Sequence, residues 1–168
     1  TAFDSAAAGI NQTWAQRLGL QSIAPLVESD VGSEVENSLG SGRWGELPEP
    51  LDLEQLIVKA AALVGATAPR RVGAAEQSVS RVAVACGSGG SFLSAAGRKG
   101  CHALITGEAT FHTCLEAESS NIGLGLLGHY PSERFAMEML AGHLSTLFPA
   151  LTVWASAAER DPIAPVIP

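Results

Sequence analysis

His129 and Glu133 stand four positions apart in the stretch Gly128-His129-Tyr130-Pro131-Ser132-Glu133-Arg134, where an apolar run gives way to a predicted helix. Residues four apart lie on the same face of a helix. An imidazole and a carboxylate together suit Zn, Mn, Fe or Co as metal ligands. A purely structural interpretation is also open, in which Pro131 begins the helix, Glu133 complements its positive end and His129 is an ordinary loop residue.

A second acid and histidine pair, Glu108 and His112, has the same spacing and again follows a predicted strand. A carboxylate near a metal-bound water can act as a general base, or can orient a ligand histidine through its second ring nitrogen. Glu108 and His112 are therefore candidate catalytic residues that handle protons or a substrate phosphate. The alternative is that Glu108 caps the helix that follows it.

A third loop is rich in glycine and serine and is a candidate anion-binding segment, because small residues let backbone N–H groups face a ligand; its members are Gly87, Ser88, Gly89, Gly90 and Ser91. It matches neither a P-loop nor a dinucleotide fingerprint, and a tight turn is the alternative. The chain order Ser91, Glu108, His129 permits a serine triad, but no G-x-S-x-G elbow surrounds either serine of the loop.

These three loops occupy equivalent places in a regular alternation of strands and helices that begins near Ser78. The predicted strands are 81–85, 103–105, 123–127 and 151–155, and the predicted helices are 92–98, 110–119 and 131–147. Such alternation is typical of an α/β fold with a mainly parallel sheet and flanking helices. In that sheet every loop from a strand into the next helix lies at the same edge, where ligands bind, so we expect the three loops to be neighbours.

The upstream half is less regular. A helix is predicted over Ala6–Leu18, with an apolar stripe at every fourth position and Gly19 as its end, and a short strand over 22–27. The polar, glycine-rich segment 28–50 predicts a surface loop or two short strands. Asp52 and Gln55 predict a capping box at the start of a second helix, and Val72 is expected in a short strand.

Composition excludes several classes of protein. The 168 residues are 46% hydrophobic, enough for one domain with a real core, and no stretch is long and apolar enough to span a bilayer. The net charge is −7, with ten basic residues among seventeen acids, so binding to nucleic acid or an anionic membrane is disfavoured. The three cysteines match no disulfide or zinc-ribbon pattern and are expected to be buried thiols. We expect a soluble, cytoplasmic protein.

Six stretches, in order, resemble the NIF-three-like dinuclear metal-centre family, also labelled GTP cyclohydrolase 1 type 2 homologues. They cover most of the chain and are residues 1–20, 40–50, 81–93, 105–117, 128–134 and 159–163. The resemblance implies two divalent metal ions, with Asp4, His129 and Glu133 among their ligands. It also implies a hexameric ring of identical chains with the sites facing an internal cavity.

The resemblance departs from the family pattern in two ways. The family's upstream histidine pair is absent, and Phe111 replaces the first of two adjacent histidines, leaving His112 alone. The chain also begins at Thr1 without methionine, so we expect it to be the downstream part of one NIF-three-like unit, with an N-terminal portion and the remaining ligands before Thr1. Residues 1–50 would follow the upstream lobe, and residues 51–168 would form the βα-repeat portion.

The functional expectation is a divalent-metal-binding protein that hydrolyses a nucleotide or another phosphorylated small molecule with metal assistance. A pair of metal ions about 3.5 to 4 Å apart is common to many phosphatases and nucleases. The metal, whether Zn, Mn, Fe or Co, is not specified by these residues. The alternative is a non-catalytic metal-binding scaffold or interaction protein whose assembly into a ring is its purpose.

Overall fold

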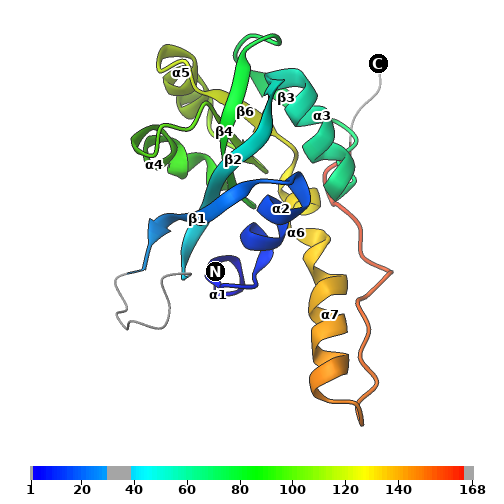
Figure 1. The fold of residues 1–168 in the computed structure, drawn as a ribbon. Coiled ribbons are helices and arrows are strands. Elements are labelled where there is room, and N and C mark those ends of the chain that lie inside the picture. Colours follow the sequence, from blue (N-terminus) through cyan, green and yellow to red (C-terminus); the bar gives the residue numbers. More distant parts are fainter. Residues whose placement is uncertain (1, 30–38, 165–168) are drawn as a thin grey trace.

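The computed structural model describes residues 2–29 and 39–164, and these form an α/β fold around a six-stranded sheet (Figure 1). The spatial order of the strands is β1-β2-β4-β5-β6-β3. Their bounds are β1 Gln21–Glu28, β2 Gly40–Asp52, β3 Arg70–Val72, β4 Ser78–Ala85, β5 Ala103–Thr106 and β6 Gly123–Leu126. Only β4, β5 and β6 pair in parallel; β1 with β2, β2 with β4, and β3 with β6 are antiparallel. The sheet is mixed, so the expectation of a mainly parallel sheet was wrong.

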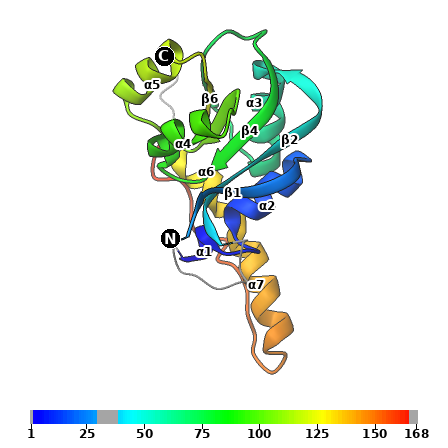
Figure 2. The same ribbon diagram turned by 60° about the vertical axis from the view of Figure 1, so that its left-hand side comes forward.

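Helices cover both faces of this sheet. They are α1 Ala2–Ser5, α2 Ile10–Leu18, α3 Leu53–Val64, α4 Leu93–Arg98 after the 3-10 turn η1 Gly89–Phe92, α5 Phe111–Ser119, α6 His129–Arg134 and α7 Ala136–Leu147. Helices α2 and α3 lie on one face and α4 and α5 on the other, while α7 extends away from the sheet (Figures 1 and 2). The expected capping box of α3 is present, with the Asp52 N–H donating to Gln55 Oε1 at 3.2 Å.

The two faces have separate hydrophobic cores because successive side chains of a strand point in opposite directions. In β4, Val82 and Val84 pack with Trp14, Leu53 and the other buried residues of α2 and α3. The alternate positions Ala83 and Ala85 pack with buried residues of α4 and α5. Residues of β4, β5 and β6 at the centre are almost fully buried on both faces, which explains their apolar runs.

Of the helix predicted over Ala6–Leu18, only α2, Ile10–Leu18, is present, and the separate short helix α1 precedes residue 6. The chain turns between them, with the Gly9 N–H donating to the Ala6 carbonyl at 3.0 Å, and α2 begins at Ile10. A Cβ atom at Gly9 would collide with the carbonyl oxygen of Phe3. The glycine therefore allows α1 to fold back against the start of α2.

Residues 40–50 belong to the long strand β2, not to a surface loop or short strands; residues 30–38 of the predicted loop lie outside the described part of the chain. Pairing with both β1 and β4 stabilises this strand despite its glycines and prolines. Pro48 and Pro50 fall between Glu46 and Leu51, where the register with β4 shifts. Proline is tolerated there because no ladder hydrogen bond is required of it.

Two predictions near the C-terminus were also wrong. The helix expected over 131–147 is two helices, α6 and α7, which meet at Phe135. Residues 151–155 form no strand. The edge of β6 is instead occupied by β3, paired antiparallel through Arg71 and Gly125. The parallel strands β4, β5 and β6 therefore have β2 on one side and β3 on the other.

The three loops that follow β4, β5 and β6 do meet at one edge, as expected, and they touch through their backbones. The Glu108 N–H donates to the Gly87 carbonyl at 3.0 Å, and the Gly128 N–H donates to the Gly107 carbonyl at 2.8 Å. The fully buried Ser132 hydroxyl accepts the Gly87 N–H at 2.9 Å and donates to the His129 carbonyl at 2.7 Å. The loops are therefore held at fixed separations.

We expect Gly107→Ala to destabilise the fold by about 1 to 3 kcal/mol, the range for overpacking. A Cβ at Gly107 would lie 2.6 Å from the Gly87 carbonyl oxygen, 2.6 Å from Ser132 Oγ and 2.9 Å from the Gly128 carbonyl oxygen. The control is Gly142→Ala in α7, where a Cβ would have no neighbour within 4 Å and which should stabilise the helix by roughly 0.5 to 1 kcal/mol. Urea unfolding measures both, and equal effects would contradict the close contact.

Candidate metal centre

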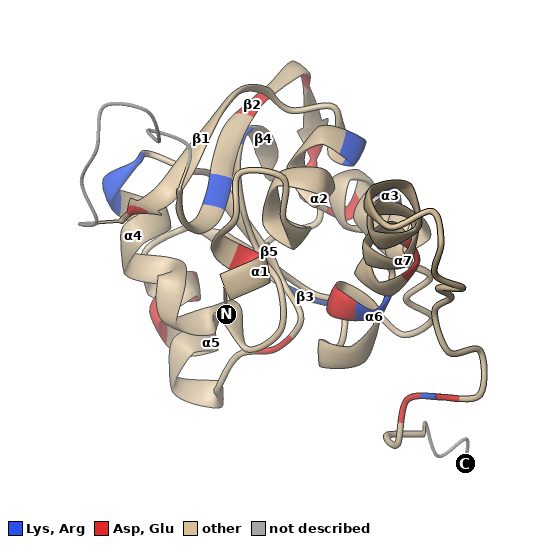
Figure 3. Ribbon diagram, turned by 90° about the horizontal axis from the view of Figure 1, so that it is seen from below, with Lys and Arg blue, Asp and Glu red and all other residues tan. Residues whose placement is uncertain are grey.

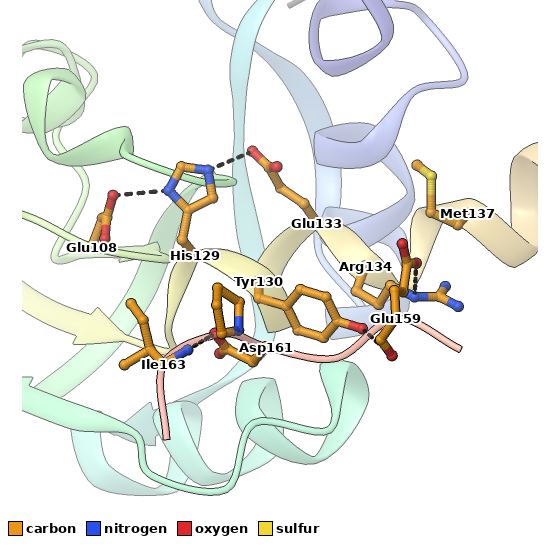
Figure 4. Close-up of a pocket in the computed structure, with 10 residues that line it drawn as sticks. Glu108, His129, Tyr130, Glu133, Arg134, Met137, Glu159, Asp161 and Ile163 are labelled. Atoms are coloured by element: carbon orange, nitrogen blue, oxygen red, sulfur yellow. Dashed lines mark hydrogen bonds and ion pairs between the residues drawn. The ribbon is translucent and has the colours of Figure 1, made fainter. Parts of the chain in front are cut away.

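His129 lies between two carboxylates. Its Nδ1 is 2.8 Å from Glu108 Oε1, and its Nε2 is 3.5 Å from Glu133 Oε1 (Figure 4). Because a carboxylate can only accept, the proton of a neutral His129 belongs on Nδ1, and the Nε2 lone pair then faces Glu133. Two acceptors that face each other favour a proton or a metal ion between them.

The charge on His129 follows from the same geometry. The hydrogen bond that His129 donates to Glu108 raises the pKa of His129, desolvation opposes that shift, and the charges of Glu133, Glu108 and Asp161 add to it. The His129 side chain is 46% exposed, so solvent screens these interactions. Without a metal ion the acidic surroundings therefore favour the imidazolium form.

Glu133 also belongs to a second group of ligand atoms. One atom each from Asp4, Cys86 and Glu133 lies within 4.8 Å of the others, and all three residues are half-buried. Asp4 comes from α1, Cys86 follows β4 directly, and Glu133 is on α6. Of the three residues expected as metal ligands, Glu133 lies near both Asp4 and His129, but His129 is not a member of the group that contains Asp4.

Cys86 is a member of this group that sequence reasoning missed. It was expected to be a buried thiol of no special role, yet it is only half-buried and lies among the acids. Burial, followed by the charges of Asp4 and Glu133, raises the pKa of the Cys86 thiol to about 12, so the thiol is protonated at neutral pH in the absence of a cation. Its place directly after β4, at the edge shared with Glu108 and His129, was the available signal.

Two buried polar side chains hold the N-terminal segment that carries Asp4. Asn11, 3% exposed, accepts the Cys86 N–H at 2.8 Å and donates to the Asp4 carbonyl at 3.1 Å. Arg43, 1% exposed, donates from β2 to the Ala6 carbonyl at 2.9 Å and to Gln12 Oε1 at 2.8 Å. The segment is therefore fixed against both the sheet and the Cys86 loop.

The Gly87–Ser91 loop is in close contact with its neighbours. The Gly87 N–H donates to Ser132 and the Gly89 N–H donates to Thr106 Oγ1 at 3.0 Å. Those two N–H groups are thus paired within the protein, and the loop has the tight packing that was the alternative to anion binding. Gly87 has a φ of +62°, and a Cβ there would lie 3.1 Å from His129 Nε2 and closer still to Glu133. Glycine is required for Glu133 to approach.

His112 and Ser91 do not join this group. His112 is exposed on α5 beside the Phe111 ring, with ring centroids 6.3 Å apart. Among the described residues, no hydrogen bond or ion pair joins His112 to Glu108, or Ser91 to His129. The pairing of Glu108 with His129 is thus seen without the serine that a triad would need.

A cleft of about 500 Å³ opens beside His129 (Figure 4). Its walls come from Glu108, from α6 and from the C-terminal segment: the lining residues are Glu108, His129, Tyr130, Glu133, Arg134, Met137, Glu159, Asp161, Pro162 and Ile163. Arg134 Nε pairs with Glu159 at 2.5 Å, and Tyr130 donates to the Glu159 carbonyl at 3.4 Å. These contacts place the C-terminal segment against α6.

The donor set suits a divalent metal ion. Carboxylate oxygens of Asp4 and Glu133 and the sulfur of Cys86 converge from separate elements, and the imidazole of His129 lies beside Glu133. The half-buried acids repel one another unless a cation is present. In the view of Figure 3, α1 and α6, which each carry an acidic position, lie near the middle of the molecule, and a basic position adjoins the acidic one on α6. Across the described ranges, no helix has both the length and the apolar character to cross a membrane.

The comparisons with known proteins agree with this fold. A family model described as Duf34/NIF3 (NGG1p interacting factor 3) matches residues 1–162. A GTP cyclohydrolase 1 type 2 homolog of Nostoc sp. is 34% identical, over 88% of this chain and 54% of the relative. The protein NIF3 homolog of Schizosaccharomyces pombe is 29% identical, over 97% of this chain and 61% of the relative.

A crystal structure of a Bacillus cereus protein related to NIF3 has the same fold, with a TM-score of 0.85 at 18% identity, over 98% of this chain and 71% of that one. The chain spans 54% and 61% of the length of the two curated relatives named above. The family model covers nearly every residue, including all members of the group around His129. The chain therefore belongs to the Duf34/NIF3 family.

Proposed function

We propose that this chain supplies part of a dinuclear centre for divalent metal ions, with Asp4, His129 and Glu133 as ligands, and that the complete protein is a metal-dependent hydrolase. The observation that carries the proposal is that Glu133 of α6 lies in one group of possible ligand atoms with Asp4 of α1 and also faces His129. Because Glu133 lies near both His129 and Asp4, its position supports a common metal-binding role for the three residues. Membership of the Duf34/NIF3 family is consistent with this proposal.

Each residue then has a distinct task. Glu108 holds the Nδ1 proton of His129, which directs the Nε2 lone pair toward Glu133 and the ligand group. Asp4 and Glu133 provide negative charge that offsets the charge of the cations. A bound metal pair supplies Lewis acidity and an activated water. Glu108 is exposed to the cleft as well, so it can accept a proton from a water or substrate there.

The proposed substrate is a nucleotide or another phosphorylated metabolite. The cleft of about 500 Å³ beside the ligands is large enough for a small molecule, and Tyr130, Pro162 and Ile163 give it apolar surface. The name GTP cyclohydrolase 1 type 2 homolog, carried by relatives, supports the nucleotide class. Contacts of a substrate phosphate with His112 or with the remaining N–H groups of Gly87–Ser91 stay predictions from the sequence.

A non-catalytic ring-forming scaffold is the second candidate, and one observation favours self-association. Helix α7 and the segment after it project from the body as an arm, here defined as residues 136–155 (Figure 2). Its end exposes large apolar side chains, with 65% of Leu147, 51% of Phe148, 61% of Leu151 and 74% of Trp154 accessible. Exposed apolar groups gathered at one place mark interaction surfaces, so we propose that the arm contacts other copies of the chain in a homo-oligomer, with a hexamer as the expected size.

Metal content and turnover test the enzyme proposal. In the full-length protein reloaded with Zn or Mn, we expect Glu133→Ala to abolish turnover on a panel of nucleotides and phosphoesters, and Asp4→Ala with His129→Ala to lower metal affinity by at least 10-fold. Glu49→Gln, an exposed acid on β2, is the control and should change neither. Metal retention without turnover on any substrate would favour the scaffold. Unchanged metal content in the double variant would contradict the site itself.

The Glu108 contact makes a separate prediction about pH. Glu108→Gln should lower the pKa of His129 in the metal-free protein, because the first cause of its upward shift is that hydrogen bond. Since the folded pKa lies above the unfolded value of about 6.5, protonated His129 stabilises the fold below that pH, and the contribution is lost as pH rises through the folded pKa. NMR titration of the ring protons measures this, with the exposed Glu118→Gln as control. An unchanged His129 titration in Glu108→Gln would refute the contact.

The arm predicts the oligomeric state. Leu151→Ser with Trp154→Ser should convert the full-length protein to smaller species in light scattering coupled to gel filtration, because both side chains are exposed at the end of the arm. Leu115→Ser is the matched control, since Leu115 is 48% exposed but lies on α5. If the unaltered protein is a monomer at micromolar concentration, the arm does not serve this purpose.

A further inference from the structure

We infer that the sulfur of Cys86 is itself a metal ligand, in the ion position shared with Asp4 and Glu133, and that it makes this position select thiophilic ions such as Zn²⁺ over Mg²⁺ or Mn²⁺. The inference rests on the proposed metal site and adds a ligand that neither the sequence motifs nor the family resemblance provides. On binding, the S–H bond is broken, the sulfur bonds the metal ion and the proton is released to solvent.

The first argument is the distance between the donor atoms. Cys86 Sγ and one carboxylate oxygen each from Asp4 and Glu133 lie within 4.8 Å of one another. Ligands of a tetrahedral zinc ion at about 2.0 to 2.3 Å are separated from one another by roughly 3.5 Å. Only small side-chain movements are therefore needed to close these three groups around one ion.

The second argument is that the backbone around Cys86 is fixed by contacts that also fix its partners. The Asn11 side chain holds the Cys86 N–H and the Asp4 carbonyl at the same time, and it is almost fully buried. On the other side of Cys86, Gly87 has no side chain and so admits Glu133. Asn11 thus joins Cys86 to Asp4, and Gly87 lets Glu133 approach Cys86.

The remaining cysteines have different surroundings, which makes them useful for comparison. Cys101 is buried within the hydrophobic cluster on the α4 and α5 face, and Cys114 packs against that cluster. The only group of three or more possible ligands found within residues 2–29 and 39–164 is the one that contains Cys86. A thiolate is a soft ligand that suits Zn²⁺, whereas Mg²⁺ and Mn²⁺ prefer oxygen, so Cys86 gives the site its selectivity.

X-ray absorption at the zinc edge tests the inference on the full-length protein loaded with Zn²⁺. We expect a sulfur neighbour at about 2.3 Å, with one sulfur per zinc if a single position fills and half a sulfur if both fill. Cys86→Ser should remove this signal while keeping the backbone hydrogen bond to Asn11. Cys114→Ser is the matched control and should retain it.

A competition measurement gives a second readout. With Zn²⁺ and Mn²⁺ offered together, Cys86→Ser should lower the preference for Zn²⁺ by on the order of 10- to 100-fold, and Cys114→Ser should leave it unchanged. Zinc bound with only nitrogen and oxygen neighbours in the unaltered protein would overturn the role of Cys86 but leave the metal site standing. Zinc content that persists in the Asp4→Ala, His129→Ala variant would instead overturn the proposed site.

Discussion

The site depends on the backbone contact among the loops that follow β4, β5 and β6. Gly107 lies in the middle of this contact, against the Gly87 and Gly128 carbonyl oxygens and the Ser132 hydroxyl. Hydrogen bonds between successive loops continue the parallel ladder beyond the last strand residues. Because the backbones touch, the points from which the side chains of Cys86, Glu108 and His129 leave them are held at fixed separations. The distances among the candidate ligands are a consequence of this packing.

The same packing brings like charges together, and this has a cost. Asp4 and Glu133 lie near a thiol and near each other, and Glu108 and Glu133 lie on opposite sides of His129. The hydrogen bond to Glu108, with the charges of the neighbouring acids, raises the pKa of His129, and burial, followed by the charges of Asp4 and Glu133, raises the pKa of Cys86. A metal ion reverses this preference, since it binds the neutral imidazole and the thiolate. The closeness that makes these acidic groups repel one another is thus the same closeness that suits them to bind a cation.

Local patterns predicted the parts of the fold that local chemistry determines. The stripe of Ile10, Trp14 and Leu18 is buried, the Asp52 capping box is formed, and the strands at 81–85, 103–105 and 123–127 are present within a residue or a few of their predicted ends. The errors concern pairing at long range. The partner β4 of β2 and the partner β3 of β6 are distant in the chain, and no periodicity within 40–50 or 151–155 indicates whether a neighbouring strand is available.

The candidate site was predictable to a similar degree. His129 and Glu133 share a helix turn, so their spacing was informative, and Glu108 follows the neighbouring strand. The position of Asp4 followed only from the resemblance, because the folding of α1 against the Cys86 loop depends on Asn11 and Arg43, whose partners are not adjacent in sequence. Cys86 was overlooked because a single cysteine matches no metal motif, and only the packed structure shows its neighbours.

The arm is continuous with both segments of the chain that border the cleft. The chain leaves the cleft through α6 and α7, and the segment after the arm returns to form the wall that contains Glu159 and Asp161. Arg134 forms ion pairs with both parts of the chain: with Glu138 near the start of α7, and with Glu159 in the segment that returns from the arm. Because Arg134 contacts both α7 and the returning segment, a displacement of the arm relative to α6 would also move the wall of the cleft that contains Glu159.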